Sequence, residues 1–481
     1  MLTERGERQF HELTVESGTS TLAMKTFYHQ SIIPLVIITV ILAWFARPAT
    51  KEAIPAGFRK FQAVYLSVWV FCVAADWLQG PYVYALYSAY GFERHVIAQL
   101  FVAGFASSLV CSCFVGMICD RFGRKKCALA YAVLYVVSCL TKHVKNYSVL
   151  MFGRVTGGAA TSLLFSCFEC WMVSEHVNRH KFSSGLLEYM FGVMYMTMYI
   201  VAIITGFVGE ALADGFHFEP LAEGSILYKG GDLVPFDASI VCCVVGFVMI
   251  LALWQENFGE DGIAQSAGGN MVTQLTDAIT IAWKDKRLIF LCFTVACFEG
   301  SMYAFVFNWT PALQSKAVPP PYGLIFALFM MACTCGSSVA TITSGWMKAG
   351  PRLMCTLLVG AAALAVAAFI GQSASPSLVA TFSAFTVFEF CCGLYFPSIG
   401  VLKSEMVPER VRATMYNIYR VPLNAVVVAL LLTDISYLRV FELCAVLQAV
   451  ALVLVGGTMV MTRMGPKGIL TDASLDAAKA A

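Results

Sequence analysis

Long apolar stretches, separated by short polar ones, fill most of this chain. About 20 apolar residues in a row cross a bilayer as a helix, and a tilted helix needs more. The segment before the first apolar stretch contains acidic residues and is too long for the start of a typical signal peptide, so we expect the first helix to be retained. The pattern predicts thirteen membrane-spanning helices, at residues 30–46, 60–89, 96–118, 127–143, 148–174, 185–209, 237–255, 287–314, 321–346, 352–371, 376–402, 411–433 and 437–462.

The composition agrees with this pattern. Of the 481 residues, 59% are hydrophobic and only 13% are charged, whereas soluble domains carry about 25% charged residues. A soluble fold is therefore excluded, and we predict an all-α polytopic membrane protein. The net charge of +2 gives no indication of nucleic-acid binding, and the 18 cysteines lack the ligand spacing of a zinc site, so we interpret them as packing residues.

Lysines and arginines predict how the helices are oriented. They are enriched in short cytoplasmic loops, and the segment 210–237 on the opposite side is acidic. The loop 141–146 is also basic but lies on the outer side, so it is an exception to this enrichment. We expect the amino terminus outside and the carboxyl terminus in the cytoplasm. The basic loops that share the cytoplasmic side are 120–126, 176–181, 284–287, 348–352 and 403–412.

An internal repeat divides the last twelve predicted spans. The stretches "FSCFEC" (165–170) and "FTVFEF" (385–390) align at an offset of 220, and each places a glutamate in the fourth helix of its half. Near this offset Asp76 corresponds to Glu299. Two related six-helix halves with a site near the midplane are typical of secondary transporters. The predicted domains are an amino-terminal tail with an extra helix (1–59), a first bundle (60–256), a cytoplasmic linker (257–286), a second bundle (287–463) and a cytoplasmic tail (464–481).

Two motifs resemble the major facilitator superfamily, which implies its fold of two six-helix halves. "GMICDRFGRKK" (116–126) is similar to the signature loop between the second and third helices, with the plain basic loop as the alternative. "GRVTGGAA" (153–160) is similar to the arginine motif of the fourth helix, where Arg154 is either structural or linked to protons. We expect Gly116 to permit close helix approach and Asp120 to meet a helix end or an arginine of the other half. The cytoplasmic gating residues expected from the first motif are Gly116, Asp120, Arg121, Gly123 and Arg124.

Longer blocks resemble one family within this superfamily, the molybdate-anion transporters. The resemblance covers residues 60 to 425 and implies uptake of the molybdate oxyanion across the cell membrane to supply molybdenum-cofactor synthesis. It also implies a multi-pass monomer in the bilayer that uses no cofactor and binds no nucleic acid. The blocks are "ADWLQGPYVYALYSAYGF" (75–92), "LLFSCFECWMVSEH" (163–176), "FEGSMYAFVFNWTPAL" (298–313), "CGLYFPSI" (392–399) and "NIYRVPL" (417–423).

Ionisable residues inside the predicted spans are the candidates for function. Each costs about 2.5–3.5 kcal/mol at a helix centre and usually faces a cavity or a partner. Four acids beside one arginine are a poor lining for a dianion. Either some acids are protonated when substrate binds, because burial disfavours the charged form, or some pair with Arg420 or Arg154. We interpret the acids as coupling or gating groups, with internal salt bridges that fix packing as the alternative. The candidates are Asp76, Glu169, Glu299, Glu389, Arg154 and Arg420.

A tetrahedral oxyanion needs N–H and O–H donors. Arg420 offers a rigid fork of them. Helix breaks at Gly80-Pro81 and Phe396-Pro397 would add backbone N–H groups at new helix starts, where the dipole favours an anion. The candidate neutral donors are Gln79, Tyr303, Asn308, Trp309, Tyr395 and Asn417, with helix packing as the alternative role for the aromatic residues.

These features predict a secondary transporter that works by alternating access. No phosphate-binding loop of the Walker type occurs, so we expect no ATP drive within this chain. Proton coupling is a hypothesis based on the carboxylates. The histidines form no metal cluster or nucleophile triad, so we expect no enzyme. The alternatives are a transporter of another anion, such as sulfate or an organic anion, and a non-transporting receptor or scaffold.

Overall fold

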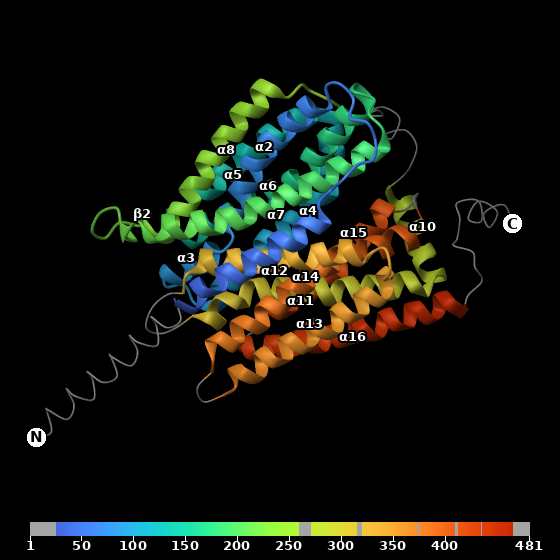
Figure 1. Ribbon diagram of the computed structural model, residues 1–481. Helices are drawn as coiled ribbons and strands as arrows, with labels where there is room; N and C mark the ends of the chain where they lie inside the picture. Colours follow the sequence, from blue (N-terminus) through green and yellow to red (C-terminus); the bar gives the residue numbers. More distant parts are fainter. Residues whose placement is uncertain are drawn as a thin grey trace, which may run out of the picture.

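The computed structural model describes residues 26–258, 271–314, 320–373, 376–408, 412–433 and 435–464. Within them the chain forms two helical bundles that lie side by side (Figure 1). A first helix, Thr26–Ala46, precedes both bundles. The first bundle contains α2 (Phe58–Gln79), α3 (Tyr82–Ala89), α4 (Arg94–Phe122), α5 (Arg124–Thr141), α6 (Tyr147–Ser174), the π-helix η1 (Glu175–Arg179), α7 (Ser184–Asp214), the 3-10 helix η2 (Gly231–Leu233) and α8 (Val234–Leu253). The linker carries α10 (Met271–Lys284), and the second bundle contains α11 (Lys286–Leu313), α12 (Tyr322–Thr343), α13 (Ala349–Gly371), α14 (Leu378–Met406), α15 (Arg412–Leu432) and α16 (Tyr437–Met464).

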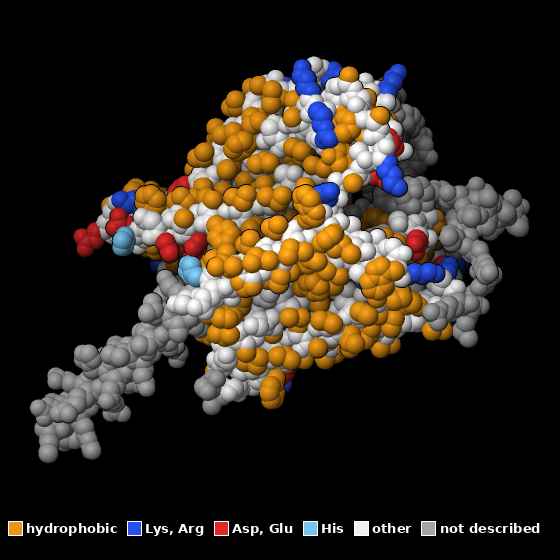
Figure 2. All heavy atoms as spheres, in the orientation of Figure 1, with side chains coloured by type: hydrophobic (Ala, Val, Ile, Leu, Met, Phe, Trp, Pro, Cys, Tyr) orange, Lys and Arg blue, Asp and Glu red, His pale blue; other side chains and the backbone are white. Residues whose placement is uncertain are grey.

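Most of these helices are built to cross a membrane. Among the described residues, eleven helices are long and apolar enough to do so. Helix α5 falls short because three basic residues fill its first turn, and α15 is apolar only over Ile418–Leu432. Apolar side chains cover the visible sides of both bundles (Figure 2). The predicted all-α polytopic fold is thus confirmed.

The two bundles repeat one packing pattern. In the first, α4 and α5 pack on α6, and α2 packs on α7 and α8. In the second, α12 and α13 pack on α14, and α11 packs on α15 and α16. Contacts between the bundles come mainly from α7 with α12 and from α4 with α15. The second and fifth helices of each half therefore form the interface, which confirms the two related six-helix halves.

The two ends of the bundles differ in charge. We call the end with the loops 120–126, 176–181 and 348–352 the basic end; many of the Lys and Arg side chains in Figure 2 lie toward it. The opposite end, which carries α3, is called the α3 end. There β1 (Glu219–Pro220) and β2 (Tyr228–Lys229) form an antiparallel hairpin. The hairpin joins the loop after α5, because the amide of Tyr228 donates to the carbonyl of His143 at 2.9 Å.

Proline has opposite effects at the two predicted helix breaks. The break at Gly80-Pro81 is confirmed, because α2 ends at Gln79 and α3 begins at Tyr82. The break at Phe396-Pro397 is wrong, because α14 runs unbroken through Pro397. Helix α14 packs against both α12 and α13. Transmembrane helices tolerate an internal proline where neighbouring helices support the freed backbone.

Candidate functional site

One arginine joins the two bundles at the α3 end. Arg94 is the first residue of α4. Its Nη2 donates to Oδ1 of Asn308 at 2.8 Å, and its Nη1 donates to the carbonyl of Ile435. The guanidinium carbon lies 5.9 Å from the ring centroid of Phe307. A single side chain of the first bundle therefore contacts α11 and the segment between α15 and α16 in the second.

A carboxylate makes a second connection at the same end. Oε2 of Glu210, near the end of α7, accepts hydrogen bonds from the amides of Gly323 at 2.8 Å and Leu324 at 3.4 Å. These amides belong to the first turn of α12, where free N–H groups and the helix dipole favour a negative charge. Helices α7 and α12 also approach closely here, because a Cβ added at Gly206 would lie 2.7 Å from the Gly323 carbonyl oxygen.

Aromatic rings extend these contacts between the bundles toward the middle of the interface. The ring of Phe307 lies 5.2 Å, between centroids, from both Tyr84 and Phe101. Further inward, Phe105 of α4 meets Tyr303 of α11 at 4.9 Å. Within the described parts of the chain, the hydrogen bonds and ring contacts between the bundles lie at the α3 end or in the middle, and none joins the basic-end loops. The structure is thus a conformation closed at the α3 end.

The second bundle gathers several of the predicted site residues around Glu299. Oε1 of Glu299 accepts a hydrogen bond from the Tyr395 hydroxyl at 3.1 Å and lies 3.5 Å from Nζ of Lys403. Tyr303 lies within electrostatic range of both Glu299 and Arg420. Arg420 is exposed on α15. The structure therefore brings an acid, two tyrosines and an arginine to one region of the second bundle.

Lys403 is a member of this group that the sequence missed. The predicted basic cytoplasmic loop 403–412 begins with this residue, but α14 continues to Met406 and directs the lysine to Glu299. Both side chains are mostly buried. The assignment to a loop is wrong because the apolar pattern ends before the helix does.

Asp76 has its contacts within the first bundle. Its Oδ1 accepts a hydrogen bond of 2.5 Å from the hydroxyl of Tyr135 on α5. Beside it, Trp77 meets Phe326 of α12 with ring centroids 5.7 Å apart. No hydrogen bond or ion pair among the described residues joins Asp76 to Glu299 or Arg420. Asp76 of α2 and Glu299 of α11 are therefore held separately, each within its own bundle.

The repeated glutamates of the fourth helices occupy different surroundings. Glu389 on α14 is buried near Cys333 and Cys392. Glu169 on α6 is half-buried, within electrostatic range of Tyr65 and Tyr195. Among the described residues, neither carboxylate makes a hydrogen bond or an ion pair with a side chain.

The remaining candidate donors either take part in a contact between the bundles or pack inside one bundle. Asn308 is fully buried and is engaged by Arg94. Trp309 packs inside the second bundle, against Tyr322 at 6.2 Å and Phe329 at 5.6 Å. Gln79 is buried at the end of α2. The side chain of Asn417 lies outside the described residues.

Arg154 connects two helices of the first bundle. Its Nε donates to the carbonyl of Leu100 at 3.1 Å, and its guanidinium carbon lies 5.0 Å from the Phe101 ring centroid. The group lies over Gly104 of α4, where an added Cβ would clash with Nη2. Gly104 thus makes the space into which the arginine fits.

The signature loop at the basic end is held by the first bundle itself. Arg124 pairs with Asp120 at 2.8 Å, one helical turn away. Gly123 has a φ of +100°, and Glu256 at the end of the bundle accepts from the amide of Lys125 at 2.8 Å. Of the two expected partners, a helix end or an arginine of the other half, Asp120 meets the arginine that begins α5 of its own bundle.

Two other residues of this loop have simpler surroundings. A Cβ added at Gly116 would meet nothing within 4 Å, so the expected close helix approach there is wrong. Arg121 is exposed, and its guanidinium carbon lies 5.6 Å from the Phe122 ring centroid. Gly123 ends α4 with a positive φ, which suits glycine.

At the α3 end, His143 contacts the start of α8. Its Nε2 lies 2.9 Å from Oδ1 of Asp237. This hydrogen bond raises the pKa of His143 above its ordinary value, although burial acts in the opposite direction. The loop after α5 and the first turn of α8 are thus linked most strongly when the imidazole is protonated.

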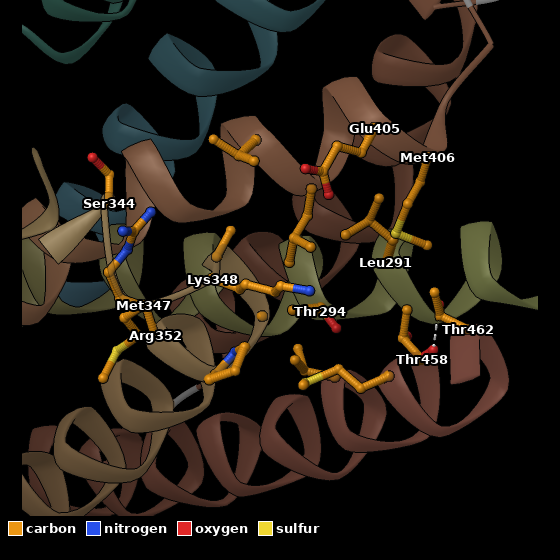
Figure 3. Close-up of a pocket in the computed structure, with 17 residues that line it drawn as sticks. Leu291, Thr294, Ser344, Met347, Lys348, Arg352, Glu405, Met406, Thr458 and Thr462 are labelled. Atoms are coloured by element: carbon orange, nitrogen blue, oxygen red, sulfur yellow. Dashed lines mark hydrogen bonds between the residues drawn. The ribbon is translucent and has the colours of Figure 1, made fainter. Parts of the chain in front are cut away.

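A hollow of about 560 Å³ lies inside the second bundle at the basic end (Figure 3). Helices α11, α13, α14 and α16 enclose it, and Lys348, Arg352 and Glu405 contribute its charges. Arg352 is held by Ser398 at 2.8 Å and by the Ala340 carbonyl at 3.0 Å. None of the predicted site residues lines this hollow. Because one bundle encloses it, relative motion of the two bundles would not expose it in turn to the two sides.

Among the described residues, no group of three or more His, Cys, Asp or Glu side chains could hold a metal ion. Two repeated six-helix bundles that meet through their second and fifth helices, with acids inside the spans, define a secondary-transporter architecture. The fold agrees with a crystal structure of the D-xylose-proton symporter, with a TM-score of 0.60 and 12% identity over 85% of this chain and 98% of that chain. It also agrees with the nucleoside transporter NupG, with a TM-score of 0.58 and 12% identity over 84% of this chain and 99% of that chain.

Sequence comparisons identify the family. Residues 27–394 match the family of major facilitator proteins described as sugar transporters with 12 TM. The molybdate-anion transporter of Takifugu rubripes is 32% identical over an alignment of 418 positions, which covers 82% of this chain and 84% of that protein. The molybdate-anion transporter of Xenopus laevis is 32% identical over 85% of this chain and 88% of its own length. The chain therefore belongs to the molybdate-anion transporter family of the major facilitator superfamily, and it is a membrane transporter and not an enzyme.

Proposed function

We propose that this protein takes up molybdate across the cell membrane by alternating access of its two bundles. The observation that carries the proposal is the closure at the α3 end, made by Arg94, Glu210 and Phe307, in a chain whose relatives are named molybdate-anion transporters. With the basic loops in the cytoplasm, this conformation faces inward, and the carboxyl terminus is cytoplasmic. A second conformation, in which these contacts separate, would admit substrate from outside.

The proposed binding surface lies on α11 and α15. Arg420 provides a fork of N–H donors, and Tyr303, which lies within electrostatic range of it, provides a hydroxyl. Tyr395 is engaged by Glu299 and serves to orient that acid. In the closed conformation both ends of the Asn308 amide are engaged, because Oδ1 accepts from Arg94 and Nδ2 donates to the carbonyl of Ala304 at 2.7 Å, so an anion would have to replace the Ala304 bond.

In the proposed mechanism, molybdate transport is coupled to the movement of protons. In the charged state, Glu299 attracts Lys403. Protonation of Glu299 would remove this attraction and release a cationic lysine toward the binding surface, where it favours a dianion. Asp76, held by Tyr135 in the other bundle, serves as the second coupling group. We assign Glu169 and Glu389 to the packing or gating of their bundles, and the loop 116–126 to gating at the basic end.

Uptake into proteoliposomes tests the substrate directly. The purified chain should accumulate radiolabelled molybdate above empty liposomes, and tungstate should compete better than sulfate because it matches molybdate more closely in size. An Arg420→Gln variant should lose most of this uptake, whereas Arg439→Gln, on the exposed surface of α16, should retain it. If sulfate or an organic anion competed better than tungstate, that anion and not molybdate would be the substrate. Absence of any uptake would favour a receptor or scaffold.

A further inference from the structure

The first helix contacts the bundles at a few points along its length and is otherwise exposed. Near its start, the ring of Tyr28 lies 5.0 Å from Phe382 of α14. In its middle, Oγ1 of Thr39 lies 3.3 Å from Sγ of Cys335 on α12. After its end, Glu52 accepts a hydrogen bond from Ser183, just before α7. Only a small share of the helix is buried.

The space behind the helix is a cavity of about 800 Å³ between the first helix, α7 and α12. This volume falls within the range of ligand pockets, about 300–1,000 Å³. The lining of the first helix begins at Val36 and continues past Arg47. At about 1.5 Å per residue this part is roughly 16 Å long, which is half of a hydrocarbon core of about 30 Å. The cavity thus has the depth of one lipid leaflet, on the side of the basic end.

The walls of the cavity are apolar along most of this depth. Val40 is 61% exposed, Trp44 63% and Ile204 53%, because their side chains border the cavity and the surrounding membrane. The hydroxyls of Thr334 and Thr341 on α12 donate to carbonyls of their own helix at 2.7 Å and 3.1 Å. Hydroxyls of Tyr189, Tyr195, Tyr199, Ser337 and Ser338 also line the cavity, so polar groups are scattered among the apolar side chains.

The mouth of the cavity at the basic end is charged. The guanidinium carbon of Arg47 lies 3.9 Å from the ring centroid of Trp44, and tryptophan is enriched at the level of lipid headgroups. Glu188 of α7 lines the same cavity. A guanidinium binds a phosphate through charge-assisted hydrogen bonds, and a carboxylate binds an ammonium. One cation and one anion at the mouth match a headgroup that carries both a phosphate and a primary amine.

We propose that this cavity binds one phospholipid of the phosphatidylethanolamine type from the basic-end leaflet. An acyl chain lies between the first helix, α7 and α12, the phosphate contacts Arg47, and the amine contacts Glu188. The lipid fills the space that separates the first helix from the interface between the bundles. The proposal does not depend on which substrate the protein transports.

Native mass spectrometry of the full-length protein tests the site. Wild-type protein released from its membrane in a mild detergent should retain one phospholipid. The double variant Ile200→Trp/Ile204→Trp fills the cavity and should lose this lipid. Val453→Trp is the matched control, because this residue is 73% exposed on α16, away from the cavity. A melting temperature like that of the control excludes misfolding as the cause of the loss.

Titration with defined lipids tests the headgroup contacts. Delipidated protein should bind phosphatidylethanolamine more tightly than phosphatidylcholine, whose quaternary amine cannot donate a hydrogen bond. Arg47→Gln should weaken binding of both about tenfold through loss of a charged hydrogen bond. Glu188→Gln should remove only the preference for the primary amine. Equal lipid retention by wild type and the filled variant, a retained sterol, or a protein dimer that covers the cavity would overturn the proposal.

Discussion

Lys403 and Glu299 form an ion pair between two membrane-spanning helices. The contribution of this pair to stability and uptake is tested by replacing the lysine. Replacement of Lys403 by methionine leaves the acid without its cation. Removal of one partner from a buried pair costs about 3 kcal/mol at the low end of measured values, so we expect a lower melting temperature and a loss of uptake.

The double variant Lys403→Met/Glu299→Gln provides the control for this pair. It removes both charges and should recover most of the lost stability, because no unpaired charge remains. Uptake should stay low, since the proposed coupling group is absent. A double variant as unstable as Lys403→Met would contradict the assigned pairing.

Proton coupling is tested at Asp76 and Glu299. A proton gradient directed inward, with the acidic side outside, should increase the initial rate of molybdate uptake by the wild-type protein. Asp76→Asn or Glu299→Gln should remove this dependence. Glu219→Gln, in the hairpin at the α3 end, is the control with an exposed acid and should respond like wild type. Uptake that ignores the gradient in wild type, and survives in both variants, would refute the coupling.

His143 gives the α3 end a pH dependence of its own. The Asp237 contact raises its pKa, so its contribution to stability is complete below the ordinary histidine pKa of about 6.5 and disappears as the pH rises through the folded-state value. Hydrogen exchange in the hairpin, corrected for intrinsic rates, should therefore be slower near pH 6 than near pH 8. In His143→Gln the two protection levels should be equal; a difference as large as in wild type would assign the effect to another group.

At the level of elements, Arg94 connects α4 to the second bundle through hydrogen bonds, beside the ring contacts of Phe101 and Phe105. Arg94→Gln removes charged hydrogen bonds worth about 1.5–3 kcal/mol each, which shifts the balance away from the closed α3 end about tenfold or more. A cysteine at Tyr84, which is 7% exposed, should then react faster with a water-soluble maleimide. Arg439→Gln is the matched control, because the side chain of Arg439 pairs with Glu442 of its own helix, α16. Equal labelling rates in the two variants would show that Arg94 does not hold the closure.

Sequence patterns predicted the elements better than their contacts. Thirteen apolar stretches of sufficient length indicated the helices, and Gly80-Pro81 marked a true break because proline lacks the N–H that would continue the helix. Pro397 gave a false break because tertiary packing supports α14. Arg94 was missed because its partners, Asn308 and Ile435, are more than 200 residues away and no local pattern indicates such a pairing.

For the molecule as a whole, the repeat was the most informative signal in the sequence. The offset of 220 between "FSCFEC" and "FTVFEF" predicted related halves, and the matched packing of α2 to α8 and α11 to α16 agrees. The repeat did not predict which acids share surroundings. Asp76 pairs with Tyr135 on α5, the third helix of its half, whereas its counterpart Glu299 pairs with Tyr395 on α14, the fourth helix of the other half.

The central claim is that molybdate crosses when the closed α3 end opens. The most direct measurement is molybdate uptake by a Tyr84→Cys/Phe307→Cys variant, whose parent rings lie 5.2 Å apart across the interface, before and after oxidative cross-linking. Uptake should be abolished by the cross-link, return on reduction, and remain unaffected by oxidant in either single variant. Undiminished uptake by the fully cross-linked protein would contradict the account.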